Sequence, residues 1–308
     1  MRGMVDGAWH RDVSPLEIRG DGARTAFATP AARVSIDVDR LARAPESFHL
    51  YAARACPFAH RVLLARALLG LDGLRVTYAN PWLGGPDGWH FPPDRDGPVA
   101  RATRLWEIYA ASDPAYTGRV TVPVLWDREA GAIASAESRE ILRALLGAFA
   151  GRNGRFSIAA AEPSLQALCD WVVDRVNLGV YRIGFSRSQD EYDAAHAAFS
   201  EALHLLNDGL GEAQFLWNDT LSLADLLLFP TAIRFDTAYQ GAFQILDIRW
   251  RDFARLQAHL ERVARLPGVV ETVAPEDYRR HYFDDSAFPI RHAGADGHYI
   301  VPRTPDPY

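Results

Sequence analysis

Apolar and polar residues follow two different periods along the chain, and the change of period divides it into two regions. Between residues 47 and 150, short apolar runs typical of strands alternate with segments that repeat an apolar residue every three or four positions. From residue 164 to about residue 275, good helical repeats follow one another without a comparable strand pattern. The pattern predicts an α/β domain followed by an all-helical domain.

The first region opens with a strand, a helix and a second strand. Strand composition at 47–53 is followed by 57–69, where apolar residues recur at helical spacing, and then by a strand-like run at 74–79. The loop that follows, 80–98, is dense in Gly, Pro and Trp. Loops of this length are usually functional or disordered, and the aromatic residues favour a function.

The region closes with two strands and a helix. Residues 119–127 have strand composition around Pro123, and a short strand and a helix that begins near Glu137 come next. This order, β-α-β-loop-β-β-α, matches a thioredoxin-like domain. Proline normally argues against a strand interior, but the corresponding proline of this fold is cis and faces the active site.

The helical region carries four apolar stripes, and one of them begins with a start signal. Ser222 and Asp225 have capping-box spacing before an apolar run. We expect five segments in all: an irregular N-terminal extension at 1–46, a thioredoxin-like domain at 47–150, a linker at 151–163, an all-helical domain at 164–275 and an irregular tail at 276–308.

Composition narrows the class of protein. The chain of 308 residues is 48% hydrophobic with a formal net charge of -6, and its acidic residues are scattered. This argues against nucleic acid as a main partner. We see no apolar run near the length of a membrane span and no apolar core of a secretory signal. The basic side chains other than histidine are all arginine, so chemistry that requires a lysine amine is excluded.

The two cysteines, Cys56 and Cys169, lie far apart in different predicted domains. A disulfide scaffold is therefore not expected, and a reducing cytoplasm fits best. Cys169 falls in an apolar helical stripe, which indicates a buried packing residue. Cys56 and His60 have the spacing of a weak metal pair, but they have no companion motif, so we expect no metal cofactor.

Cys56 stands at a strand-to-helix corner with Pro57 behind it. Proline suits the first helical position, which makes Cys56 the N-cap residue, where free N–H groups and the helix dipole favour an anion. We therefore expect a lowered pKa and a reactive thiolate. Ala59 occupies the place of the second cysteine of a dithiol oxidoreductase. A mixed disulfide on Cys56 must then be resolved by an external thiol such as glutathione.

Seven blocks, in order over about residues 48–283, carry a resemblance to a known family. They are ACPFAHRVLLARALLGLDGL, GWHF, DPAYTGRVTVPVLWD, AESREI, NLGVYRIGF, RFDTAYQG and ETVAPEDYRRHYF. The sequence resembles the glutathionyl-hydroquinone reductases, the Xi class of the glutathione transferase superfamily. The resemblance implies the glutathione transferase fold and a homodimer. It also implies a reaction in which a cysteine takes the glutathionyl group from a hydroquinone, and a second glutathione then releases this group as glutathione disulfide.

The resemblance also assigns roles to residues of the first domain. Cys56 would be the nucleophile, and Trp89 would pack against bound glutathione. Arg119 would hold a glutathione carboxylate, and Val122 would bond the cysteinyl backbone of the ligand through its own main chain. The ordinary alternatives are a loop anchor for Trp89 and a solvated charge for Arg119.

The remaining assignments concern the γ-glutamyl end of the thiol and the acceptor. Glu137 and Ser138, at a helix start, would receive the γ-glutamyl group. Tyr181, Tyr239 and Tyr282 would direct phenols at the hydroquinone, because a tyrosine can both stack and hydrogen-bond. A plain helix start and half-buried packing tyrosines are the corresponding alternatives.

Two positions depart from the family pattern. Phe58 stands where a tryptophan is usual, and Phe283 stands where a second tyrosine usually follows Tyr282. These changes leave the acceptor open. The alternatives are an omega-like transferase acting on other disulfides or conjugates, the use of another small thiol such as mycothiol, and a binding module without catalysis.

Overall fold

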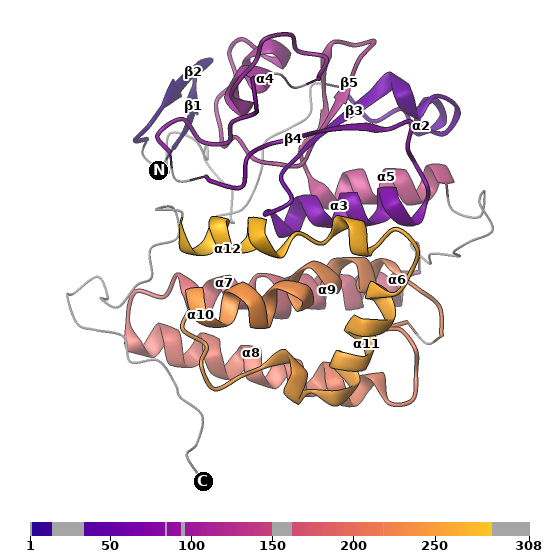
Figure 1. Cartoon of the computed structure of the whole chain (residues 1–308), viewed down its shortest axis with the longest axis vertical. Helices are drawn as coiled ribbons and strands as arrows, with labels where there is room; N and C mark the ends of the chain where they lie inside the picture. Colours follow the sequence, from indigo (N-terminus) through magenta and orange to yellow (C-terminus); the bar gives the residue numbers. More distant parts are fainter. Residues whose placement is uncertain are drawn as a thin grey trace. The chain divides into compact units, whose positions relative to one another are not determined.

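The computed structural model of the chain describes residues 2–13, 34–83, 85–93, 96–149, 162–217 and 219–284. These residues form two compact units, one ending at Phe149 and the other ending at Asp284 (Figure 1). The first unit contains a small mixed sheet with helices and the second is helical, as expected. The domain boundaries that we expect from the sequence stay predictions.

A four-stranded sheet forms the centre of the first unit, in the order β4-β3-β5-β6. Its strands are β3 (Phe48–Ala52), β4 (Arg75–Tyr78), β5 (Val124–Asp127) and β6 (Ala132–Ser135). Leu50 of β3 lies opposite Val76 in the parallel pair with β4 and opposite Leu125 in the antiparallel pair with β5. All five residues of β3 are buried, as a central strand covered on both faces requires.

Helices cover this sheet. Those of the first unit are α2 (Val38–Arg43), α3 (Pro57–Leu68), α4 (Leu105–Ser112) and α5 (Ser138–Phe149), with a 3₁₀ turn η1 at Pro45–Ser47. Helices α3 and α5 lie side by side below the strands in the view of Figure 1, and α4 lies above them. The N-terminus of α3 follows directly on the end of β3, so Cys56 stands close to the central strand.

Helix α4 was not predicted from the sequence. This helix buries Leu105, Ile108 and Tyr109 at helical spacing, but it has only eight residues and follows a loop rich in Gly and Pro. Its N-terminus is fixed by Glu107, whose carboxylate accepts the backbone N–H of Arg104 at 2.7 Å. The strand predicted at 119–127 is shorter than expected, because β5 begins only after Pro123.

The prediction that the two ends of the chain are irregular is wrong for those end residues that the structure describes. Strands β1 (Gly3–Val5) and β2 (Ala8–His10) form a hairpin, and α2 lies within the same segment. Strands of three residues are too short for a period to be seen. At the other end, α12 (Pro275–Phe283) begins with a proline at its first position. The expected linker up to residue 161 and the tail beyond residue 284 lie outside the described residues.

The described part of the second unit is entirely helical apart from loops and one isolated bridge. Its elements are α6 (Pro163–Trp171), η2 (Val172–Asn177), α7 (Gly179–Gly184), α8 (Gln189–Leu210), α9 (Leu223–Arg234), η3 (Phe235–Tyr239), α10 (Gln240–Ala242), η4 (Trp250–Asp252), α11 (Ala254–Ala264), η5 (Val270–Thr272) and α12. Segments η2 and η3 are π-helical, a form often found at functional sites.

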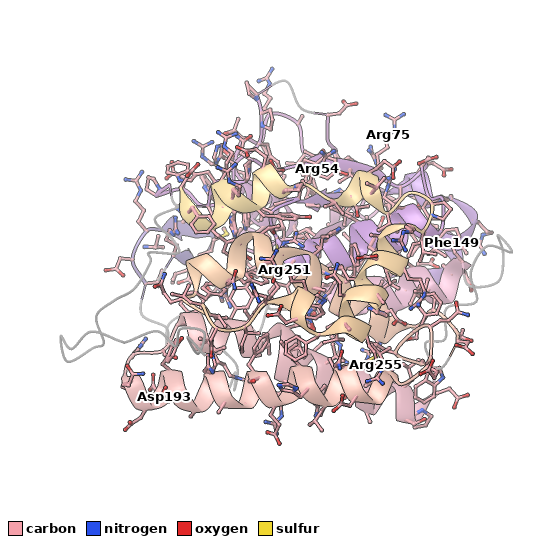
Figure 2. All side chains as sticks on the ribbon, turned by 60° about the horizontal axis from the view of Figure 1, so that its bottom comes forward. Arg54, Arg75, Phe149, Asp193, Arg251 and Arg255 are labelled. Atoms are coloured by element: carbon pink, nitrogen blue, oxygen red, sulfur yellow. The ribbon has the colours of Figure 1, made fainter. Side chains whose placement is uncertain are left out.

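Two helices of this unit show how the sequence sets their ends and faces. Helix α9 begins with the predicted capping box, in which the Asp225 carboxylate accepts the backbone N–H of Ser222 at 2.7 Å. Its other oxygen lies 2.7 Å from Nε2 of His259 on α11. Helix α11 buries Leu256 and Leu260 on one face, while Arg255 on another face is exposed (Figure 2).

Candidate functional site

Cys56 is the N-cap residue of α3, as predicted. Its backbone is extended, and its carbonyl accepts the N–H of His60 at 3.0 Å, which starts the helix. Pro57 occupies the first helical position. Cys56 is 8% exposed, and its Sγ donates to the carbonyl oxygen of Val122 at 3.7 Å. A cysteine thus lies at a helix N-terminus, where N–H groups favour a negative charge.

The peptide bond between Val122 and Pro123 is cis, as the fold predicts. Two tyrosines hold the backbone that leads to it. The Tyr109 hydroxyl donates to the carbonyl of Thr121 at 2.9 Å and accepts the N–H of the same residue at 3.3 Å. The Tyr116 hydroxyl donates to the carbonyl of Arg119 at 2.7 Å. The backbone segment that leads to Pro123 is therefore held by two tyrosines that lie outside the sheet.

Burial changes the acidity of both tyrosines. Desolvation raises the pKa of Tyr109 to about 12, and the hydrogen bonds at Thr121 only partly oppose it. Desolvation also raises the pKa of Tyr116 far above its ordinary value, with a smaller contribution from neighbouring Tyr109. Both phenols are therefore protonated at neutral pH and act as hydrogen-bond donors to the loop.

Glu137 and Ser138 stand at the N-terminus of α5, and α5 packs against α3. The Glu137 carboxylate accepts the backbone N–H of Arg139 at 3.2 Å, so it caps the helix. Ser138 is buried, and its Oγ accepts from the guanidinium of Arg61 at 3.4 Å. Arg61 belongs to α3, one turn and a half after Cys56, so it ties the thiol-bearing helix to this expected γ-glutamyl site.

Arg61 was not predicted as a site residue. It is 2% exposed, and its guanidinium lies over the ring of Phe58 at 4.7 Å. No signal in the sequence indicates that this arginine is buried, because its partner Ser138 lies on another helix. Phe58 thus has a packing role beside the thiol, although it departs from the family pattern.

Trp89 and Arg119 stand on two loops of the first unit. Trp89 is 5% exposed, and its carbonyl accepts the N–H of Leu105 at the start of α4. Arg119 is half-buried, and its charge opposes the rise in the pKa of Tyr109 and Tyr116.

The three predicted tyrosines of the second unit converge. The hydroxyl of Tyr181 lies 2.6 Å from that of Tyr282 and 3.5 Å from that of Tyr239, and the third pair is 3.3 Å apart. Tyr181 follows the π-helical segment η2, and Tyr239 ends η3. The three side chains are buried, and their oxygens form a triangle of mutual hydrogen bonds.

Arg234 lies beside this tyrosine cluster and was not predicted as a site residue. It is fully buried, its guanidinium lies 3.8 Å from the ring centre of Tyr278, and it donates to the carbonyl of Pro230 at 2.8 Å. Burial alone lowers the pKa of Arg234, but Tyr278 and the three clustered phenols outweigh it, and the pKa stands above its ordinary value. The cluster thus includes a permanent positive charge.

That charge acts on Tyr282. Burial raises the pKa of Tyr282 well above its ordinary value, and neighbouring Tyr181 and Tyr239 raise it further. The positive charge of Arg234 works in the opposite direction. An oxygen that gains negative charge near these phenols would find three O–H donors and a cation in a dry environment, an arrangement that stabilises oxyanions.

Four other predicted features concern the second cysteine, Phe283, a metal site and a membrane span. Cys169 is fully buried in α6, as expected, and neither cysteine forms a disulfide. Phe283, at the end of α12, is 43% exposed. Within the described ranges, no group of three or more His, Cys, Asp or Glu side chains could hold a metal ion. Within the same ranges, no helix is long and apolar enough to cross a membrane.

Comparison with known proteins agrees with this arrangement. The family described as "Glutathione S-transferase, N-terminal domain" matches residues 55–146, and "Glutathione S-transferase, C-terminal domain" matches residues 189–262. The glutathionyl-hydroquinone reductase YqjG of Escherichia coli is 35% identical over 91% of this chain and 90% of its own. The omega-like glutathione S-transferase 2 of Schizosaccharomyces pombe is 33% identical over 77% of this chain and 80% of its own.

Solved structures of related proteins are similar to this chain over nearly its whole length. A Xi-class glutathione transferase from Natrialba magadii is 32% identical, with a TM-score of 0.81 over 99% of this chain and 95% of its own. The glutathione-bound structure of E. coli YqjG is 31% identical, with a TM-score of 0.74 over 98% of this chain and 96% of its own. The chain therefore belongs to the glutathionyl-hydroquinone reductases, the Xi class of the glutathione transferase superfamily.

Proposed function

We propose that this protein is a thiol-dependent reductase that removes the glutathionyl group from glutathionyl-hydroquinones. The observation that carries the proposal is Cys56, placed as the N-cap of α3 with Sγ 3.7 Å from the carbonyl of Val122. Ala59 stands where an internal resolving cysteine would be needed. The relatives named above, one of them with glutathione bound, support the choice of thiol.

The proposed reaction has two balanced steps. The Cys56 thiolate attacks the sulfur of the glutathionyl group, so that an S–S bond forms and the bond from sulfur to the aromatic carbon breaks. The electron pair of that bond goes to the hydroquinone ring, which takes up a proton. A second glutathione, as thiolate, then attacks the mixed disulfide, and glutathione disulfide leaves with Cys56 restored as thiolate.

Each proposed binding residue has a place in this scheme. Val122 bonds the cysteinyl backbone of glutathione, Arg119 holds a carboxylate, and Trp89 packs against the ligand. Glu137 and Ser138 take the γ-glutamyl end, where the N-terminus of α5 favours a carboxylate.

The acceptor is proposed to meet the tyrosine cluster. Tyr181, Tyr239 and Tyr282 would donate to the oxygens of the hydroquinone, because their hydroxyls already converge. In the keto tautomer of the hydroquinone, which already has a proton on the sulfur-bearing carbon, the electron pair of the broken carbon–sulfur bond passes into the ring and onto the carbonyl oxygen as an enolate, and O–H donors lower the energy of that state.

A second candidate is an omega-like transferase that acts on other disulfides or conjugates. The exposed Phe283, in place of the usual tyrosine, favours it, because this change removes one phenol that could contact the acceptor. A non-catalytic binding module and a different small thiol are further alternatives. Parallel assays with a glutathionyl-hydroquinone and with a small glutathione mixed disulfide distinguish the two enzymes, and mycothiol in place of glutathione tests the thiol.

The test of the proposed function is the Cys56→Ala variant. We expect it to lose at least about a thousandfold of the rate of glutathionyl-hydroquinone reduction, since the nucleophile is gone. Cys169→Ala is the matched control, because Cys169 is the other buried cysteine of the described residues, and it should retain the wild-type rate. A Cys56→Ala rate close to that of the wild type would refute the proposal.

We also propose a cytoplasmic location and a homodimer. A mechanism that depends on an unoxidised Cys56 and on reduced glutathione needs a reducing compartment. Cell fractionation and sedimentation analysis test these two points separately.

A further inference from the structure

The N-terminal hairpin, residues 3–10 with flanking Arg2 and Arg11, contacts two loops of the first unit. Its strands β1 and β2 are antiparallel, with Met4 opposite Trp9. Each strand has only three residues, and a two-stranded hairpin is at best marginally stable alone in water. The folded hairpin must therefore be stabilised by its contacts with these two loops.

One loop that the hairpin contacts leads to Arg119. Met4 and Gly118 exchange two backbone hydrogen bonds of 2.9 Å in an antiparallel bridge. The N–H of Gly7 donates to the carbonyl of Tyr116 at 3.0 Å, and the N–H of Asp6 donates to the Thr117 hydroxyl at 2.8 Å. Strand β1 and its turn thus pair with the residues directly before Arg119.

Gly7 allows this close approach. Its φ of +79° lies in the left-handed region, and a Cβ there would fall 1.8 Å from the carbonyl oxygen of Pro114. Only glycine fits both conditions.

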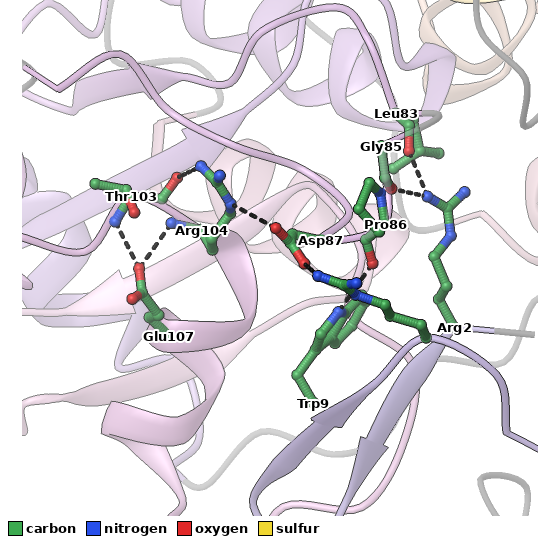
Figure 3. Close-up of polar contacts among 10 residues, drawn as sticks. Arg2, Trp9, Leu83, Gly85, Pro86, Asp87, Thr103, Arg104 and Glu107 are labelled. Atoms are coloured by element: carbon green, nitrogen blue, oxygen red, sulfur yellow. Dashed lines mark hydrogen bonds and ion pairs between the residues drawn. The ribbon is translucent and has the colours of Figure 1, made fainter.

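The second loop leads to Trp89. Arg2 donates through one guanidinium nitrogen to the carbonyls of Leu83 and Gly85 (Figure 3). The indole N–H of Trp9 donates to the carbonyl of Pro86 at 3.1 Å. These contacts hold main-chain atoms of the loop just before Trp89.

Charge and stacking extend the contact toward α4. Asp87 lies between Arg11, at 3.1 Å, and Arg104, at 3.8 Å. The Trp9 ring stacks on Trp106 with 6.5 Å between centroids and an interplanar angle of 13°. A Cβ on Gly88, whose φ is +69°, would lie 3.2 Å from the Trp9 ring, so the ring closely covers the residue that precedes Trp89.

We propose that the N-terminal hairpin is a positioning element of the thiol-binding site, which joins the loop of Trp89 to the loop of Arg119 and fixes both before glutathione binds. The inference rests on the proposed function in one respect, that Trp89 and Arg119 contact the thiol. Loops fixed in advance lose less conformational entropy when a ligand binds, so the hairpin increases affinity without touching the ligand. Hairpin residues are therefore positioning residues and not catalytic ones.

The test measures binding of reduced glutathione by titration calorimetry, in a Cys56→Ser background that cannot form a mixed disulfide. Trp9→Ala removes both the hydrogen bond to Pro86 and the stack on Trp106, and we expect it to weaken binding about tenfold. Trp9→Phe keeps a ring but loses the N–H donor, and we expect about threefold. His10→Ala is the matched control, since this neighbouring residue of β2 is exposed, and it should bind as the parent does.

A second variant makes the test independent of whether Trp9→Ala folds. Gly7→Ala displaces the hairpin from Pro114 on the other loop, and it should weaken glutathione binding in the same direction as Trp9→Ala. With Cys56 restored, both variants should raise KM for glutathione and change kcat by less than about threefold, because the reacting groups are unaltered. Thermal unfolding of each variant shows whether the fold is retained.

The outcomes separate this inference from the proposed function. Equal glutathione affinity in folded Trp9→Ala, folded Gly7→Ala and His10→Ala overturns the role of the hairpin and leaves the reaction untouched. Weakened binding in both, together with a wild-type enzyme that fails to reduce glutathionyl-hydroquinones, supports the hairpin and overturns the reaction. A Cys56→Ser parent that binds no glutathione overturns both.

Discussion

Cys56 and Cys169 are both buried, but their places in the secondary structure differ. Cys169 lies within α6 and is fully buried. Cys56 stands at the end of a helix, where its Sγ contacts the carbonyl of Val122 and its own carbonyl begins the helix. The positive end of the helix dipole therefore acts on Cys56 and not on Cys169. Position and not burial distinguishes the expected nucleophile from a packing residue.

At the same scale, Arg234 provides a prediction for the tyrosine cluster. Arg234→Met removes the buried charge but keeps much of the apolar side chain, so oxygens near Tyr282 lose their cation. We expect kcat for a glutathionyl-hydroquinone to fall about tenfold or more, while glutathione affinity stays unchanged. Steady-state kinetics and calorimetry measure the two quantities. Arg234→Lys, which keeps a positive charge, is the control and should recover part of the rate.

Tyr109 provides a prediction of pH dependence. Burial raises its pKa to about 12 in the folded protein, from an ordinary 10.0. The folded state therefore holds this proton more tightly, so the stabilisation is complete below pH 10 and is lost as pH rises toward 12. Denaturant unfolding at a series of alkaline pH values should show a steeper fall of the unfolding free energy in the wild type than in Tyr109→Phe.

Tyr109→Phe also loses the hydrogen bonds to Thr121, which should cost about 1 kcal/mol at neutral pH. The decisive quantity is thus the difference in slope above pH 10 and not the offset. Parallel curves for the two proteins would show that Tyr109 does not hold its proton as described.

At the scale of elements, the hydrophobic pattern predicted those segments that are long enough to show a period. Helices α3 and α5 and strand β3 lie where the sequence predicted them, and α9 begins at the predicted capping box. The missed elements have a common cause. The three-residue strands β1 and β2 are fixed by bonds to distant loops, and α4 has only eight residues, so the local sequence carries little signal for either.

The contact between α2 and the sheet gives an element-scale prediction. Arg40 of α2 forms an ion pair with the buried Asp127 of β5, whose carboxylate also accepts the N–H of Ala130. Burial by itself raises the pKa of Asp127, but the Ala130 N–H and the Arg40 guanidinium outweigh it and hold the pKa below its ordinary 3.8. This stabilisation is present above pH 3.8 and is lost as pH falls further.

Asp127→Asn should therefore lower the free energy of unfolding by about 1–3 kcal/mol at neutral pH. The difference from the wild type should shrink in acid, where the wild-type carboxyl is protonated. Urea unfolding at neutral and acid pH measures this. Glu129→Gln is a suitable control, because Glu129 also contacts Arg40 but is largely exposed, and a loss as large as that of Asp127→Asn would contradict the account.

At the scale of the whole molecule, the blocks of sequence that indicated the family also contain the residues proposed for the chemistry. The cis bond before Pro123, the N-cap position of Cys56 and the convergence of Tyr181, Tyr239 and Tyr282 agree with the expectations drawn from them. Arg61 and Arg234 could not be recognised in this way, because only the fold shows that these two cations are buried. Their partners lie on other elements, far away in the sequence.

Cys56 is proposed to carry the glutathionyl group, as a mixed disulfide, from the first thiol step to the second. The most direct test is peptide mass spectrometry after mixing the protein with one equivalent of a glutathionyl-hydroquinone and no added glutathione. We expect a glutathione mixed disulfide on Cys56 and none on Cys169, with hydroquinone released in equal amount, and loss of the adduct as glutathione disulfide when glutathione is added. Hydroquinone released while Cys56 stays unmodified would contradict it.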